Sequence, residues 1–415
     1  MRMSKRFLAL LLVLFLNTYP AVAVDIPIDF SFTGSGYGHG VGMSQMGARS
    51  MAIGGSSAPQ ILQYFYKDVV IEPIDDSKIV RVNIGHLLTN TKISAGTDGA
   101  IVQFFSGDIG DQVDVLPLAV LPTKASLNLT VLGASLVPSI SVGKKITSFA
   151  KGRSFTIRWS GTRYLTGADA LISITHNGAT KRYRYGQMQV RAVKDPALGY
   201  RLELTNSVRL SDEYLWGISE MPSFWPVEAL KAQVIASRSY AMSKAGTYRS
   251  TCDCELYGEI SDQMFLGYAK EIEKKYGVIW KEAVLQTAGL VMTQEGRPIT
   301  AYFSSSSGGK TELALNAWGS AKPYTHIVDD PGSLDRALNP RFVTWSRTVA
   351  QPMIAAAFLL PDVVALEIVS RNESGTVGQI RARSSTGAQF TIRGETFRSR
   401  TKIPSAYFDL VGVQN

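Results

Sequence analysis

The sequence feature that most limits the fold is a long stretch, from Thr91 to Arg184, of short alternating segments rich in Val, Ile, Thr, Ser and Gly. Such segments favour strands separated by turns. Asn177-Gly178 lies between two of them, which is typical of a two-residue β-hairpin. An all-helical fold is therefore excluded, and we predict a β-rich insertion or small domain over residues 91–182.

Helix signals lie on both sides of this stretch. Pro226 suits the first position of a helix that continues through Met242, and Glu228 falls in its positively polarised first turn. Further helices are predicted at 60–67, 281–287 and 352–359, and strands at 78–86, 200–216 and 299–303. The fold class is therefore predicted to be α+β.

The first 23 residues have the composition of a targeting segment. Three basic residues precede the apolar run Phe7 to Leu16, and Ala21-Val22-Ala23 follows. This order predicts a secretory signal cleaved after Ala23, and hence a secreted or cell-wall location. The alternative is an uncleaved anchor, for which the apolar run is short, so any membrane contact is expected only through this segment.

The remaining chain is basic, which bears on its partners. Removing three of the 43 basic residues leaves 40 against 34 acidic residues, a net charge of +6. Such a surface favours anionic partners, and for an exported chain wall polymers are favoured over nucleic acid or lipid.

Cys252 and Cys254 are the only cysteines, and they lie two residues apart. A local disulfide, a pair of free thiols and a metal site with distant ligands all remain open. The four histidines are scattered along the sequence, so a metal site would need residues from several segments.

Three common motifs are excluded. Gly309-Lys310-Thr311 resembles the end of a phosphate-binding loop, but Ser304 occupies the required earlier glycine. The glycines between 34 and 42 lack the strand, helix and acid of a dinucleotide site. The serines from 304 to 307 lack the glycines of a nucleophile elbow.

Glu220 is the best candidate for acid chemistry. It precedes the predicted helix and lies among Trp216, Phe224 and Trp225. An apolar pocket would raise the pKa of this carboxyl and let it hold a proton near neutrality, as a general acid for a glycosidic oxygen must. The alternative is a capping or structural glutamate. Arg238 falls on the buried arc of the same helix, so we expect an internal partner for it.

Three segments together resemble the sporulation stage II protein D family, also known as the amidase-enhancer or LytB family. They are GYGHGVGMSQMGA (36–48), YLWGISEMPSFWPVEALKAQVIASRSYAM (214–242) and ITAYFSSSSGGKTE (299–312), which is followed by AW and PYTHIVDDP. The resemblance covers most of 30–90 and 183–410 but not the β-rich stretch.

The resemblance implies action on peptidoglycan, with Glu220 as the catalytic acid and base. Some relatives are lytic transglycosylases that cleave glycan strands stripped of stem peptides, and others are amidase enhancers. The predicted substrate-binding set is His39, Gln45, Trp225, Arg238, Tyr240, Ser307, Gly308, Gly309 and Lys310. The rival interpretation is a non-catalytic wall-binding protein that recruits or activates an amidase.

The resemblance also implies a division of the chain. A signal (1–23) is followed by the first part of a SpoIID-like core (24–90), the β-rich insertion (91–182) and the main part of the core (183–415). The GHGVGMSQ segment comes first here but near the end in familiar members, the pattern of a circular permutation. We therefore expect the strand near Phe30 to contact residues 407–411.

Some relatives have a cysteine- and histidine-rich loop that can bind zinc after the central helix. Here the corresponding TCDCELYGE has no histidine. No metal or other cofactor is therefore predicted, and the expected partners are glycan strands and, in the rival interpretation, an amidase.

Overall fold

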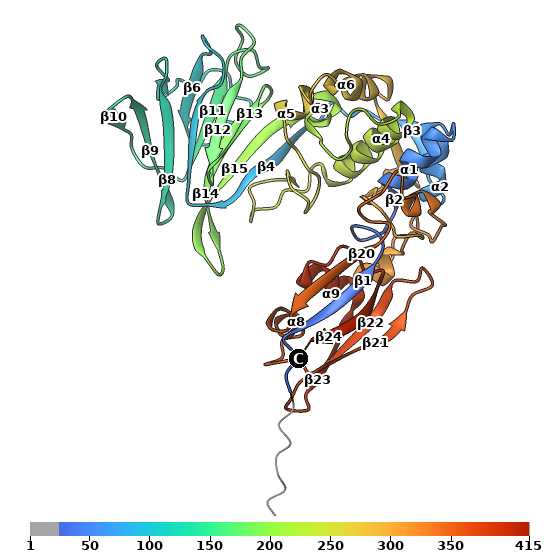
Figure 1. The fold of residues 1–415 in the computed structure, drawn as a ribbon. Coiled ribbons are helices and arrows are strands. Elements are labelled where there is room, and N and C mark those ends of the chain that lie inside the picture. Colours follow the sequence, from blue (N-terminus) through green and yellow to red (C-terminus); the bar gives the residue numbers. More distant parts are fainter. Residues whose placement is uncertain (1–24, 415) are drawn as a thin grey trace, which may run out of the picture.

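The computed structural model describes residues 25–414, so the predicted signal segment lies outside the described residues. Figure 1 shows three regions: a β-sandwich, a helical region beside it, and a smaller region that combines strands and helices. Helices and several separate sheets alternate along the chain. The predicted α+β class is confirmed.

The first layer of the sandwich is a six-stranded sheet made within the β-rich stretch. Its order is β10 (Lys145–Ser148), β9 (Ser135–Val142), β8 (Ser126–Leu132), β5 (Asn90–Ala95), β12 (Ile172–His176) and β13 (Ala179–Tyr183). Strands β12 and β13 pair directly around Asn177 and Gly178, both of which have positive φ. The predicted hairpin is confirmed, because this turn needs residues that tolerate the left-handed conformation.

The second layer is a seven-stranded sheet. Its order is β16 (Leu256–Tyr257), β4 (Ile79–Leu88), β15 (Gly199–Arg209), β14 (Gln187–Asp195), β11 (Ser154–Trp159), β6 (Val102–Ser106) and β7 (Ala119–Val120). Strands β4, β14 and β15 lie outside residues 91–182 but share this sheet with β6 and β11. The hydrogen bonds of this sheet therefore join strands on both sides of the predicted boundaries at 91 and 182. The division into domains at these residues stays a prediction.

The helical region is built around α4 (Val227–Lys244), which is buried on almost every side. It contacts α1 (Gln45–Ile53), α2 (Ala58–Phe65), α6 (Gly277–Gln286) and β17 (Leu290–Gln294). The helix predicted from Pro226 begins one residue later, and Val227 is exposed in its first turn. A helix that is covered on all sides needs no polar face. The sequence therefore predicted that α4 is a helix, but not which elements pack around it.

Short elements complete this region. They are α3 (Leu215–Gly217), α5 (Tyr268–Glu271), α7 (Ala314–Trp318), β2 (Met43–Ser44), β3 (Val70–Pro73), β18 (Arg297–Pro298) and β19 (Phe303–Ser304), with a π-helical turn at Leu210–Tyr214 and a 3-10 turn at Pro331–Leu334. Two predicted strands were too long. The strand predicted at 200–216 stops at Arg209, where the chain turns into helix, and of 299–303 only Phe303 is in a strand.

The third region joins the two ends of the described chain. Strand β1 (Asp29–Gly34) lies between β20 (Trp345–Ala350) and β24 (Phe408–Gln414). The other elements are α8 (Gln351–Phe358), β21 (Ala365–Arg371), β22 (Val377–Arg383), β23 (Gln389–Arg393) and α9 (Gly394–Thr401). Gly34 is paired with Phe408 and Asp29 with Gln414. The expected contact between the two segments is confirmed, while the circular permutation stays our interpretation of it.

Candidate functional site

Glu220 lies in the connection between α3 and α4. Ile218 forms a bridge with Phe265, and the backbone N–H of Ser219 donates to the Met264 carbonyl. These contacts hold the connection extended, and the Glu220 carboxylate accepts a hydrogen bond of 2.6 Å from the Met264 backbone N–H. The carboxylate is thus fixed by the segment that follows α4 in sequence, and its side chain is only partly exposed.

The environment of Glu220 favours its protonated form. Burial raises the pKa of Glu220 to about 7, and the Met264 hydrogen bond and the charge of Lys270 oppose this rise. A carboxyl with this pKa is shared between its acid and base forms near neutral pH. It can therefore donate a proton and accept one back under the same conditions.

The aromatic residues next to Glu220 in sequence point in different directions. Phe224 is 56% exposed and packs against Tyr276. The ring of Trp216 packs against Tyr185, and the Arg49 guanidinium lies 4.9 Å from the ring centre of Trp225. Each ring therefore has a packing partner other than Glu220, and an aromatic pocket around the carboxyl stays a prediction.

Gln45 connects Glu220 to the first motif. Its side-chain N–H groups donate to the Glu220 carbonyl at 3.1 Å and to Oε1 of Gln233, in α4, at 3.2 Å. Gln45 begins α1 directly after β2. The structure therefore places this predicted substrate-binding residue against the backbone of Glu220.

The first and third motifs lie side by side. Strands β2 and β19 pair in parallel, and Tyr37 forms a bridge with Ser306. Gly36 has a positive φ, and a Cβ there would lie 2.8 Å from the backbone nitrogen of Gly308. Both segments need glycine at this close approach.

His39 is held inside this junction. Its Nδ1 accepts a hydrogen bond from the Val41 N–H at 3.0 Å, and its ring packs edge-on against Trp318. Burial, and then the charge of Arg398, lower the pKa of His39 to about 3, against a hydrogen bond to the Phe303 backbone. The imidazole is therefore neutral at ordinary pH.

The serine-glycine turn is also supported from within. Ser307 is buried; its hydroxyl donates to Asp330 at 2.6 Å and accepts from the Gly309 N–H at 3.2 Å. Lys310 is half exposed and forms an ion pair with Asp329. Among the predicted substrate-binding residues of this turn, Lys310 therefore has an accessible charged side chain.

Arg238 is 0% exposed and forms an ion pair of 2.7 Å with Asp76. It also donates to the carbonyls of Thr287 and Leu290. The predicted internal pairing is confirmed, and the side chain has no exposed surface for a substrate, although it was placed in the substrate-binding set.

Tyr240 belongs to an aromatic row that the sequence did not reveal. Its hydroxyl donates to Asp262 at 2.7 Å, and its ring lies 6.3 Å from that of Tyr302. Tyr302 in turn lies 4.7 Å from the partly exposed Trp318 and 6.4 Å from His39. Tyr302 lies in the third motif and Trp318 in the AW that follows it. Their place in that motif was the one sequence feature that could have pointed to these two rings as site residues.

Comparison with known proteins adds to this geometry. The SpoIID (stage II sporulation protein) family model matches residues 199–294. The match includes Glu220, Met264 and all of α4. Residues 199–294 therefore form a SpoIID domain.

Two kinds of relative represent the SpoIID family among curated proteins. Stage II sporulation protein D of Bacillus subtilis is 35% identical over 218 residues, and that of Bacillus amyloliquefaciens is 29% identical over 218 residues; each match covers 48% of this chain and 59% of the relative. The amidase enhancer of Bacillus subtilis is 39% identical over 107 residues, 26% of this chain and 13% of the relative. The chain thus spans less than two thirds of these relatives.

The loop after α4 does not fit the zinc site known from some SpoIID proteins. Cys252 and Cys254 form a disulfide, and no histidine lies near them in sequence. Within residues 25–414 no group of three or more His, Cys, Asp and Glu side chains could hold a metal ion. Of the three alternatives for the cysteines, the structure contains the disulfide.

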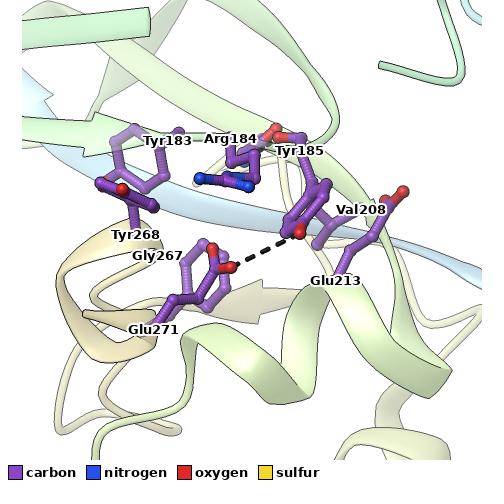
Figure 2. A pocket seen from close by; sticks show the side chains of 10 residues that line it. Tyr183, Arg184, Tyr185, Val208, Glu213, Gly267, Tyr268 and Glu271 are labelled. Carbon is purple, nitrogen blue, oxygen red and sulfur yellow. Dashed lines mark hydrogen bonds between the residues drawn. The ribbon is translucent and has the colours of Figure 1, made fainter. Parts of the chain in front are cut away.

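A separate small cavity of about 10 Å³ lies between the sandwich and the helical region. Figure 2 shows Tyr185 and Glu271, which are hydrogen-bonded at 3.4 Å, on its wall with Arg184 and Tyr268. None of the predicted SpoIID site residues lines this cavity. One lining residue, Phe265, directly follows Met264, whose backbone N–H donates to Glu220.

No helix in residues 25–414 is both long enough and apolar enough to cross a membrane.

Proposed function

We propose that this protein is a lytic transglycosylase that acts on peptidoglycan strands lacking stem peptides. The observation that carries the proposal is Glu220: a partly buried carboxyl, fixed by Met264, whose pKa burial raises to about 7. The match of residues 199–294 to the SpoIID family model supports it.

In the proposed reaction, protonated Glu220 donates its proton to the oxygen between N-acetylmuramic acid and the next sugar. The C1–O bond breaks, and an oxocarbenium-like state develops at C1. The Glu220 carboxylate then takes the proton of the muramoyl 6-hydroxyl, whose oxygen bonds to C1 and closes an internal ether. Because the nucleophile belongs to the substrate, the second carboxylate of glycoside hydrolases is not required.

The aromatic side chains of the three motifs support a saccharide substrate. The row formed by Tyr240, Tyr302 and Trp318 leads to His39, and aromatic rings offer apolar faces on which sugars stack. Neutral His39 and Gln45 are fixed by internal hydrogen bonds, so we assign them to holding the motifs in place.

The test is digestion of denuded glycan strands, with products identified by mass spectrometry. The wild-type chain is expected to release anhydromuramoyl products, and Glu220→Gln to release none. Glu228→Gln is the matched control, because this glutamate lies eight positions along the same segment and pairs with Lys231 near the surface. Products with reducing ends, or equal release by Glu220→Gln, would contradict the proposal.

The second candidate is a non-catalytic wall-binding protein that activates an amidase, favoured by the 39% identity to an amidase enhancer. It predicts that the wild-type chain and Glu220→Gln raise the rate of a purified wall amidase equally and that neither cleaves glycan. Cleavage that depends on Glu220, without effect on the amidase, would exclude it. Both candidates place the protein at the cell wall outside the cytoplasm.

A further inference from the structure

Lys270, in α5, is a buried cation that none of the motifs identified. It is 1% exposed, and lysine is almost never buried this fully unless it is paired. It lies in the segment after α4, a few residues beyond Met264, and its charge acts on Glu220. A buried ammonium is costly, so its position calls for an explanation.

The ammonium group of Lys270 has three surroundings that match its three N–H donors. It donates to the Met221 carbonyl at 2.6 Å and to the Glu273 carboxylate at 2.6 Å, and it lies 4.9 Å from the ring centre of Trp280. Met221 directly follows Glu220. One of these bonds therefore restrains the backbone that carries the candidate acid.

Glu273 extends this restraint by two residues. Its carboxylate accepts a hydrogen bond of 2.6 Å from the Ser223 hydroxyl and a longer bond from the Ser223 N–H. Lys270 and Glu273 thus hold both ends of the Met221-Pro222-Ser223 turn. Proline in the turn removes a backbone donor, so side-chain contacts are the main means of fixing it.

We propose that Lys270 is a positioning residue for Glu220: it clamps the turn after Glu220 and holds a buried positive charge at the carbonyl of the next residue, Met221. The inference rests on the proposed role of Glu220. Lys270 does not touch the substrate and takes no part in proton transfer.

The charge has a definite consequence for proton exchange. Burial favours the neutral carboxyl, and a nearby cation favours the carboxylate, so the two effects oppose each other. A carboxyl that must donate and then accept a proton needs its protonated and ionised forms to be close in free energy at the working pH. The other ionisable groups around Glu220 and Lys270 are Glu273, Tyr214, and Tyr240 with Asp262 and Arg249. Among the charges, Lys270 is the one that lowers the pKa of Glu220.

The experiment measures the titration of Glu220 directly, by carboxyl ¹³C NMR on the full chain without substrate. Lys270→Met and Lys270→Gln are expected to move the Glu220 midpoint to higher pH, because each removes the charge. Lys270→Gln retains a donor for the Met221 carbonyl, so it separates the charge from the clamp. Lys270→Arg is expected to restore the wild-type midpoint.

Lys275→Met is the matched control, since this lysine is exposed in the same segment and its ammonium lies over Tyr276. It should leave the midpoint unchanged. Ser223→Ala, which loosens the turn and keeps every charge, should also leave it unchanged, and it provides a folded variant if Lys270→Met unfolds.

Where glycan cleavage is observed, the loss of activity at alkaline pH should move upward with the midpoint in Lys270→Gln. An unchanged Glu220 midpoint in both neutral variants would overturn the inference and leave Lys270 with a purely structural role. An inactive wild-type chain with shifted midpoints would instead refute the proposed function alone.

Discussion

Glu220 combines two properties at the scale of one residue. Its carboxylate receives a backbone hydrogen bond, which favours the charged form, and it is buried enough that the neutral form is still well populated near pH 7. Ionisation of such a residue costs free energy, because the charge must then lie in a partly buried site. The cost can be measured without any substrate.

We predict that Glu220 makes the folded protein less stable as the pH rises. The pKa of Glu220 in the folded chain, about 7, lies above the ordinary value of 4.5, so the folded state binds the proton more tightly than the unfolded state. The stability that this proton confers is fully present below about pH 4.5 and is lost as the pH rises through 7. Glu220→Gln should therefore be more stable than wild type at pH 8, by about 3 kcal/mol.

The measurement is urea unfolding of both chains at pH 5 and pH 8. The difference between them should grow with pH, whereas Glu228→Gln should show no such growth. A wild-type chain that gains as much stability as Glu220→Gln between pH 5 and pH 8 would contradict a raised pKa in the folded state.

At the scale of elements, α4 is fixed by a charge inside the protein. Arg238 pairs with Asp76, which lies before β4, and with carbonyls at the end of α6. The helix is thereby attached to two segments far from it in sequence. Removing the arginine leaves Asp76 without its partner.

We predict that Arg238→Met destabilises the fold by about 3–5 kcal/mol, the cost of breaking a buried ion pair. Lys231→Met is the matched control on the same helix, because its pair with Glu228 is partly exposed and worth about 0–1 kcal/mol. Urea unfolding followed by tryptophan fluorescence measures both. Equal losses in the two variants would show that burial of the pair contributes nothing.

The sequence predicted elements better than it predicted their surroundings. The hairpin at Asn177-Gly178 and the helix from 227 to 244 were found because their signals are local. The strand assigned to 200–216 was too long, because apolar residues after Arg209 are equally suited to the buried turn that forms there. The motifs led to Glu220, but Met264 and Lys270 approach its region from a segment that only the tertiary fold brings to it. No spacing in the sequence encodes those distances.

At the scale of the whole molecule, charge gives a prediction about binding. The chain from residue 24 has a net charge of +6, and glycan strands carry lactyl carboxylates. Binding to denuded glycan should weaken as salt is raised, because at about 0.15 M salt charges more than ~8 Å apart are largely screened. Co-sedimentation at several salt concentrations measures this. Chitin, which has no carboxylates, is the control polymer, and an equal salt dependence for both would show that contacts other than charge dominate.

Strand β1 lies in its sheet between β20 and β24, which start at Trp345 and Phe408. Its inward side chains, Phe30 and Phe32, are fully buried against residues from the far end of the described chain. During synthesis, β1 emerges long before either neighbour exists, and contacts that distant in sequence form slowly. The nascent chain must therefore keep two phenylalanines and an unpaired strand edge away from other molecules until synthesis has passed residue 408, which makes this region the last to mature and the one most dependent on chaperones.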